Sequence, residues 1–383
     1  MPRHPRVAPS VSGIGGSVYS ALAHRMATFE GDVYPLHVGD TWLEPAIGCR
    51  MQDLRVDENP GMHRYASPQG TPELRDAIVE RVASRMHVPT ERAHVLVTTG
   101  ATGGLGAAVG GLVEPGDEVL LLAPYWPLIS GIVRCFHATP IDVPFINLVD
   151  SAQAAVEAVR AHCTARTVAL YVSTPNNPTG KLIAAEWIEA LVDWAVAQNL
   201  WILSDEVYED YVYEGQHAYC RALAPEHTIS VHSFSKAFGM AGNRCGYVVG
   251  PERVIGEFTK VSTHSFYSTP TASQLAARRA LDGRGDAWIA DAKPRYRELG
   301  ERAARKLGVA PPQGSTFLFV DVQSQLDERG LMGFLEDCAQ RGLFLAPGPS
   351  FGPYPTHIRI CFTSAPPECI DRGVDILAQL LGR

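Results

Sequence analysis

Short apolar runs of strand length recur through the middle of the chain, and stretches with helical spacing separate several of them. The apolar runs cover residues 118–122, 167–172, 200–203, 228–231 and 247–249. A helical pattern over 185–198 lies between two of these runs. Nearly continuous apolar strands that alternate with helices are typical of a parallel sheet buried on both faces. The pattern therefore predicts an α/β fold whose ligands bind at the carboxyl ends of the strands.

Helical spacing also marks the region before these runs and the region after them. Thr71 is a plausible N-cap, and Pro72 suits the first turn of the helix that follows. The apolar positions of this helix are Leu74, Ile78, Val82 and Met86. Beyond about Ala287, a long helical segment precedes strands at 316–322 and 357–362, which together indicate a smaller α+β domain.

The length of the chain, 383 residues, exceeds what one hydrophobic core usually holds, so we expect two domains. Residues 1–45 are expected to form an N-terminal arm and part of the small domain, with the arm over residues 1–11. A large domain, with a mostly parallel sheet covered by helices, is expected over 46–285. The C-terminal small domain is expected over 286–383.

Composition and charge narrow the possible partners. Lys and Arg number 33 against 41 Asp and Glu, a net charge of −8, so no basic surface for nucleic acid is expected. No early segment resembles a signal peptide, and no apolar stretch approaches the length of a membrane span. The eight cysteines are scattered without a Cys-x-x-Cys pair, which favours reduced thiols. We therefore expect a cytoplasmic protein without nucleic-acid or membrane partners, and we assign no metal ligand.

Candidate chemistry begins at a lysine placed just after an apolar run. Lys236 ends the sequence Ser233-x-Ser235-Lys236, and Arg244-x-Gly246 follows after seven intervening residues. A lone lysine is most often a solvated surface charge. A lysine can instead form a Schiff base with an aldehyde cofactor such as pyridoxal phosphate (PLP). The phosphate of that cofactor needs hydroxyls and a guanidinium, which the two serines and the arginine supply.

A carboxylate and two hydrogen-bond donors suit the ring of the same cofactor. Asp205 ends an apolar run, where a helix cap or an ion pair is the usual role. A carboxylate beside the ring nitrogen of PLP favours the protonated ring, which is the electron sink of this chemistry. Tyr208, and Asn177 in the turn-forming sequence Asn-Asn-Pro-Thr-Gly at 176–180, can donate to the phenolic oxygen of the ring.

Two further segments suit the phosphate and the ring face. Thr99-Gly100-Ala101-Thr102 leads into a helical stretch, and small residues at a helix N-terminus form an anion site from free N–H groups and the helix dipole. Taken alone, this segment is better explained as a flexible glycine turn. Trp126 follows the run at 118–122 and suits either the core or stacking on a planar ring.

Taken together, these motifs resemble the class I/II aminotransferases, the aspartate-aminotransferase-like family of fold type I PLP enzymes. The resemblance extends from about Val38 to Ile360, and it rests on several motifs occurring in the family's order. In chain order the motifs are Tyr65…Gly70-x-Pro72-x-Leu74-Arg75, Thr99-Gly100-Ala101-Thr102, Pro124-Tyr125-Trp126, Asn176-Asn177-Pro178-Thr179-Gly180, Asp205-x-x-Tyr208, Ser233-x-Ser235-Lys236…Arg244-x-Gly246, Pro347-Gly348-x-x-Phe351-Gly352 and Arg359.

The resemblance implies a role for each matching residue. Lys236 is implied to be the Schiff-base lysine and the proton carrier, with Asp205 and Tyr208 as the other catalytic residues. The implied cofactor-binding residues are Tyr65, Ala101, Thr102, Trp126, Asn177, Asp205, Tyr208, Ser233, Lys236 and Arg244. The implied substrate-binding residues are Gly39, Asn177 and Arg359, the last of which holds the α-carboxylate. Tyr65 is implied to reach the phosphate of the neighbouring subunit, so a homodimer with shared active sites is expected.

The implied reaction is a ping-pong transfer of an amino group from an α-amino acid to a 2-oxo acid through a Lys236 aldimine. The alternative is elimination or replacement on the same fold, as in C–S lyases and aminocyclopropane-carboxylate synthase, because each branch needs Lys236, Asp205 and Arg359. Thr102 stands where some aspartate-specific relatives carry a lysine, which disfavours aspartate as the preferred substrate. A PLP-dependent DNA-binding regulator is disfavoured, because the segment before Val38 is too short for a winged helix.

Overall fold

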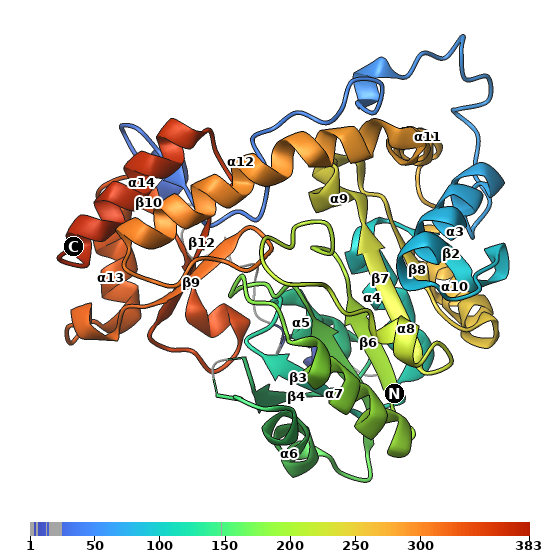
Figure 1. Ribbon diagram of the computed structural model, residues 1–383, viewed down its shortest axis with the longest axis horizontal. Coiled ribbons are helices and arrows are strands. Elements are labelled where there is room, and N and C mark those ends of the chain that lie inside the picture. Colours follow the sequence, from blue (N-terminus) through green and yellow to red (C-terminus); the bar gives the residue numbers. More distant parts are fainter. Residues whose placement is uncertain (1–3, 5–6, 13, 15–24, 147) are drawn as a thin grey trace.

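The computed structural model describes residues 4, 7–12, 14, 25–146 and 148–383, and its largest element is a seven-stranded sheet (Figure 1). The strand order is β2-β8-β7-β6-β5-β3-β4. β8 is antiparallel to both of its neighbours, and the other pairings are parallel. The strands are β2 (Val95–Thr98), β3 (Glu118–Ala123), β4 (Thr139–Pro144), β5 (Thr167–Ser173), β6 (Trp201–Asp205), β7 (Thr228–Ser233) and β8 (Gly246–Val249).

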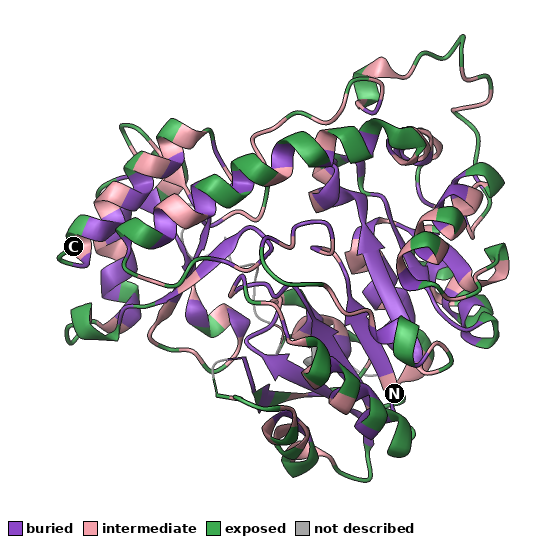
Figure 2. Cartoon of the chain, viewed as in Figure 1, coloured by how far each residue is buried: buried purple, intermediate pink, exposed green. Residues whose placement is uncertain are grey.

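Helices cover both faces of this sheet, which confirms the predicted α/β class. One face packs on α4 (Gly100–Leu112), α5 (Leu128–Cys135) and α10 (Glu252–Phe266). The opposite face packs on α6 (Ala152–His162) and α7 (Ala185–Ala197). Figure 2 shows the strands buried and the outer faces of the helices exposed.

A third group of helices packs beside β2 and β8 at one end of the sheet. α3 (Pro72–Met86) buries the predicted apolar positions Leu74, Ile78, Val82 and Met86. The helix ends there because His87 takes the left-handed conformation, with φ 55°. The short helices are α1 (Pro9–Ser12), α8 (Cys220–Leu223), α9 (Phe234–Ala237) and α11 (Thr271–Arg279). Of the predicted N-terminal arm, residues 1–3 and 5–6 lie outside the described residues.

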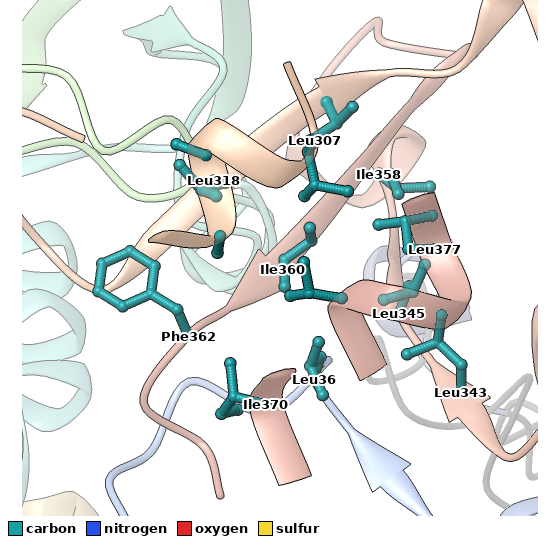
Figure 3. Packing of buried hydrophobic residues seen from close by; sticks show 14 of the residues in the cluster. Leu36, Leu307, Leu318, Leu343, Leu345, Ile358, Ile360, Phe362, Ile370 and Leu377 are labelled. Atoms are coloured by element: carbon teal, nitrogen blue, oxygen red, sulfur yellow. The ribbon is translucent and has the colours of Figure 1, made fainter. Parts of the chain in front are cut away.

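The C-terminal region builds a second core around a three-stranded antiparallel sheet of order β11-β12-β9. Its elements are α12 (Gly285–Lys306), β9 (Phe317–Asp321), α13 (Gly330–Ala339), β10 (Leu343–Phe344), β11 (Ala346–Pro347), β12 (His357–Cys361) and α14 (Pro367–Leu380). Figure 3 shows Leu36 among the buried side chains of this core. The strand β1 (Tyr34–Pro35) pairs with β10, so residues near the N-terminus belong to this core. The long α12 reaches this core from the side of the large sheet (Figure 1).

Two strands of the large sheet, β2 and β4, were not predicted from the sequence. β4 is an edge strand with Pro140 and Pro144 and is only partly buried, so it lacks the continuous apolar signal of a central strand. β2 is as short and as buried as the predicted strand β8, so its apolar run could have been found in the same way. Within the described residues, no helix is both long enough and apolar enough to cross a membrane.

Candidate active site

A cavity of about 600 Å³ opens at the carboxyl ends of the central strands. Its lining residues are Ala101, Thr102, Leu105, Trp126, Asn177, Asp205, Val207, Tyr208, Ser233, Ser235, Lys236, Ala241 and Arg244. All the predicted cofactor-binding residues except Tyr65 are among them. The fold therefore gathers at one place side chains that are far apart in the sequence.

Lys236 reaches the cavity from the short helix α9, directly after β7. Ser233 caps this helix, because its hydroxyl oxygen accepts a hydrogen bond from the Ser235 N–H at 3.0 Å. The Lys236 amine donates to the carbonyl oxygen of Gly39, which brings the predicted substrate residue Gly39 beside the lysine. Burial lowers the pKa of Lys236. A lowered pKa increases the fraction of neutral amine, the form that attacks an aldehyde.

Asp205 faces the cavity at the end of β6. Its Oδ2 accepts a hydrogen bond from the Tyr171 hydroxyl at 2.6 Å, and its Oδ1 accepts one from the Val207 N–H at 3.3 Å. Burial raises the pKa of Asp205 to about 6, while these two hydrogen bonds act in the opposite direction. Tyr208 is buried beside it, packs edge-on against Phe317 with 5.6 Å between ring centroids, and has a pKa raised by burial. Its hydroxyl therefore remains a donor at neutral pH.

The N-terminus of α4 forms another wall of the cavity. Ala101 and Thr102 lie in the first turn of this helix, which begins at Gly100. The N–H groups at a helix start have no acceptor within the helix, and the helix dipole is positive there. This wall is therefore suited to an anion such as a phosphate group.

The Arg244 guanidinium lies against the same helix end. Its Nη1 donates to the Ala241 carbonyl oxygen at 2.9 Å and to Ser235 Oγ at 3.5 Å, and its Nη2 donates to the Thr99 carbonyl oxygen at 3.4 Å. Glycine at position 100 permits this approach, because a Cβ atom there would lie 2.7 Å from Arg244 Nη2. The guanidinium and the helix end together place positive charge on one side of the cavity.

Arg359 lies on β12, in the second core, and contacts a residue that lines the cavity. Its Nη1 donates to Asn177 Oδ1 at 3.1 Å, and its Nη2 donates to the His37 carbonyl oxygen at 2.5 Å. The guanidinium also lies 4.4 Å from the ring centroid of Phe317 and 4.8 Å from that of Phe351. These contacts fix a buried cation next to Asn177, which lines the cavity.

Tyr65 is the predicted cofactor residue that this chain does not bring to the cavity. Its side chain is 87% exposed and packs against Tyr267, with 5.0 Å between ring centroids. Both tyrosines line a separate groove on the surface. Trp126, by contrast, is half-buried and lines the cavity.

Sequence reasoning missed several residues of the site. Leu105, Val207 and Ala241 line the cavity without being predicted, because small and apolar side chains carry no chemical signal. Leu105 could have been found from its spacing, since it lies one helical turn after Ala101. Tyr171 was placed only within an apolar strand, and no local pattern linked its hydroxyl to a carboxylate on the next strand.

The chemistry of this cavity fits PLP. An amine with a lowered pKa, a buried carboxylate and an anion-binding helix end with a guanidinium all face one space. Because Gly100 has no Cβ atom, the Arg244 guanidinium can lie against this helix end. The fold and the site define a PLP-dependent enzyme of fold type I.

Comparisons with known proteins agree with this class. The profile of the family "Aminotransferase class I and II" matches residues 33–377. The aspartate/prephenate aminotransferase of Thermus thermophilus is 32% identical over 333 residues, 84% of each chain. A probable N-succinyldiaminopimelate aminotransferase of Mycobacterium tuberculosis is 34% identical over 272 residues, 68% of each chain. The structure of Thermus thermophilus aspartate aminotransferase with maleate superposes with a TM-score of 0.90 at 28% identity, over 98% of this chain and 100% of that one.

The chain belongs to the class I and II aminotransferase family. It is a PLP-dependent aminotransferase that acts on an amino acid and a 2-oxo acid. The family resemblance inferred from the motifs is thereby confirmed.

Proposed function

We propose that this enzyme moves an amino group from an α-amino acid to a 2-oxo acid in two half-reactions, with Lys236 as the reacting lysine. The observation that carries the proposal is that the Lys236 amine and the Asp205 carboxylate line the same cavity, beside the anion site of α4. In a ping-pong order, the first 2-oxo acid leaves before the second one binds. When bound, PLP supplies the electron sink that stabilises negative charge at the substrate α-carbon.

The residues proposed to hold the cofactor divide into three groups. The phosphate is assigned to the N–H groups and hydroxyls of Ala101, Thr102 and Ser233, with Arg244 as the cation. The ring is assigned to Trp126 on its face, Asp205 at its nitrogen, and Asn177 and Tyr208 at its phenolic oxygen. Lys236 would lie at the aldehyde, because its primary amine is the group suited to carbonyl chemistry.

The substrate is assigned to the side of the cavity next to β12. Arg359 binds the α-carboxylate, because a guanidinium forms two parallel hydrogen bonds with a carboxylate. Its contacts with Asn177 and the His37 carbonyl oxygen hold its orientation before the substrate arrives. Gly39 contributes backbone contacts at the same place. The Lys236 amine would remove the proton from the substrate α-carbon as a general base.

The identity of the amino donor is a separate question. Several relatives are named aspartate aminotransferases, which makes aspartate the first donor to test. Among the described residues that line the cavity, Lys236 and Arg244 are the cations, and both are assigned to the cofactor. With Arg359 assigned to the α-carboxylate, this chain offers no further cation there for a second carboxylate. We therefore expect a donor with an uncharged side chain to be preferred over aspartate.

We also propose that the enzyme is a cytoplasmic homodimer whose subunits share their active sites. The exposed Tyr65 and Tyr267 support this assembly, because their rings form an apolar surface beside a groove that this chain leaves open.

Lys236→Ala tests the proposed chemistry. The wild-type protein is expected to show a visible absorbance band with PLP, and adding the preferred amino acid should bleach the band with release of one 2-oxo acid. Lys236→Ala should lose the band that depends on the lysine and nearly all turnover, because the variant has neither the amine nor the proton carrier.

The control for this experiment is Lys260→Ala, since Lys260 is an exposed residue of α10 paired with Glu257 at 2.7 Å. Its spectrum and turnover should match those of the wild type. Ammonia or a thiol in place of the 2-oxo acid would assign the enzyme to the elimination branch. Full turnover by Lys236→Ala would contradict the role of the lysine.

A further inference from the structure

A hydrogen bond between side chains of neighbouring strands lies next to the cavity. The Tyr171 hydroxyl, on β5, donates to Asp205 Oδ2, on β6, at 2.6 Å. The register pairs Ser173 with Asp205 and Tyr171 with Leu203. Side chains two residues apart on a strand share a face, so Tyr171 is the diagonal neighbour of Asp205 on the same face of the sheet. A tyrosine is long enough to span that diagonal.

Tyr171 is buried, and its hydroxyl lies beside Asp205 and Ser173. The side chain is fully buried, and its ring packs in the core between the large sheet and the helices α4, α5 and α10. Burial and the nearby Asp205 carboxylate raise the pKa of Tyr171 well above its usual value, so the hydroxyl keeps its proton. The donor is therefore present at neutral pH.

The structure assigns Tyr171 as a positioning residue for Asp205: its hydroxyl orients the carboxylate and stabilises the carboxylate anion that the ring nitrogen of the cofactor requires. This inference rests on the proposed function, in which Asp205 partners that nitrogen. Tyr171 does not line the cavity, so it acts through Asp205 and not on the cofactor.

The electrostatic surroundings of Asp205 explain why such a donor is needed. Burial raises the pKa of Asp205, and the neighbouring Glu206 carboxylate raises it further. The Tyr171 hydroxyl, the Val207 N–H and the His232 ring on β7 lower it, and the tyrosine has the largest effect of the three. Without the tyrosine hydroxyl, the carboxyl group would protonate at a higher pH and lose the charge that holds the ring proton.

The sign of the resulting pH dependence follows from the raised pKa. The neutral carboxyl contributes stability that is fully present below its ordinary pKa of 3.8 and is lost as pH rises through about 6. Removing the hydroxyl raises the folded-state pKa further, so the loss of stability is larger where the carboxylate is ionised. Packing of the Tyr171 ring does not depend on pH. A substitution that acted only through packing would therefore lower the stability equally at both ends of this range.

Tyr171→Phe tests the inference on the full-length protein freed of PLP, because it removes one oxygen and keeps the ring. Thermal unfolding is measured at about pH 5 and about pH 8. The shift in Tm caused by the substitution should be about twice as large at the higher pH, since a hydrogen bond to a charged acceptor is about twice as strong as one to a neutral acceptor. Equal shifts at the two pH values would overturn the inference.

Tyr213→Phe is the matched control. Its hydroxyl is also buried and donates at 2.6 Å, but the acceptor is the Ser315 carbonyl oxygen, which does not titrate. Its Tm shift should be the same at both pH values. Asp205→Asn provides a second measurement that needs no Tyr171 variant. The Tm of this variant minus that of the wild type should be larger at about pH 8 than at about pH 5. Combining it with Tyr171→Phe should abolish the pH dependence of the tyrosine substitution, and a dependence that persists would also overturn the inference.

The affinity for PLP tests whether Tyr171 affects the cofactor site. It also distinguishes a failure of this inference from a failure of the proposed function. At about pH 8, Tyr171→Phe should weaken PLP binding about tenfold, the effect of losing one hydrogen bond to a charged group, while Tyr213→Phe should leave it unchanged. Unchanged affinity in Tyr171→Phe, together with normal binding by the wild type, overturns the role of Tyr171 alone. A wild-type protein that binds no PLP overturns the proposed function, and this inference with it.

Discussion

At the scale of the residue, the site depends on charges that the protein has removed from water. Lys236 and Asp205 are both shifted toward their neutral forms by burial. The lysine gains nucleophilicity from this shift. In the proposed function the Asp205 carboxylate needs its charge, and hydrogen bonds from Tyr171 and the Val207 N–H act against the effect of burial. One environment thus serves two residues with opposite requirements.

Arg359→Lys tests the carboxylate assignment at this scale. A lysine cannot donate to Asn177 and also form two parallel hydrogen bonds with a substrate carboxylate. The KM for the amino acid should rise about tenfold or more, because the variant loses one charge-assisted hydrogen bond, which is worth about 1.5–3 kcal/mol. Steady-state kinetics would measure this effect. Arg297→Lys, an exposed arginine paired with Glu301 at 2.7 Å, is the matched control and should behave as the wild type. An unchanged KM in Arg359→Lys would remove Arg359 from the substrate site.

At the scale of the element, the anion site depends on how closely α4 approaches β8. Gly246 lies at the start of β8, and a Cβ atom there would be 2.7 Å from the Gly100 carbonyl carbon and 2.8 Å from the Ala101 nitrogen. Gly100 itself adopts φ +73°, a conformation that L side chains rarely take. These two glycines therefore allow the helix start to sit against the strand and against Arg244.

Gly100→Ala is expected to disturb the anion site and the fold together. The left-handed conformation costs an alanine about 1–2 kcal/mol, and the new Cβ atom would displace the Arg244 guanidinium. Urea unfolding should show this loss of stability, and PLP binding should weaken at the same time.

Gly106→Ala is the control in the same helix. A Cβ atom there meets nothing within 4 Å, so this variant should be more stable by about 0.5–1 kcal/mol and should bind PLP normally. Normal PLP affinity in Gly100→Ala would show that the helix start does not hold the phosphate.

At the scale of the whole molecule, the site draws on two cores. The large sheet supplies Lys236, Asp205 and Asn177, while Arg359 comes from β12 of the second core. The described residues of the second core include Leu36, so a segment near the N-terminus and the C-terminal region pack together (Figure 3). The predicted domain boundaries stay a prediction.

Shared sites in a dimer predict that two inactive variants restore each other. In a mixed dimer of Tyr65→Ala and Lys236→Ala, one of the two sites receives Tyr65 from one subunit and Lys236 from the other, and is intact. Random exchange makes half of the dimers mixed, so the mixture should regain about a quarter of wild-type activity. Co-expression with two affinity tags, followed by turnover assays, would measure it. Mixed dimers no more active than the Tyr65→Ala homodimer would contradict a shared site.

The sequence by itself determined the class of fold and predicted most of the residues that line the cavity. Apolar runs of strand length identified the central strands, because buried parallel strands have no polar face. The order of short polar motifs predicted Lys236, Asp205, Asn177 and Arg244 as site residues, because each motif carries its chemistry within a few residues, and all four line the cavity. The edge strand β4 was not predicted, since its partial exposure and its prolines weaken that signal.

Only the tertiary structure decided which distant residues meet. Tyr171 reaches Asp205 because of the register between β5 and β6, and Arg359 reaches Asn177 because the second core packs against the first. Neither contact leaves a local pattern, since each depends on a pairing of segments far apart in the chain. Tyr65 does not line the cavity of its own chain, and its exposed side chain packs against Tyr267, another contact between segments far apart in the sequence.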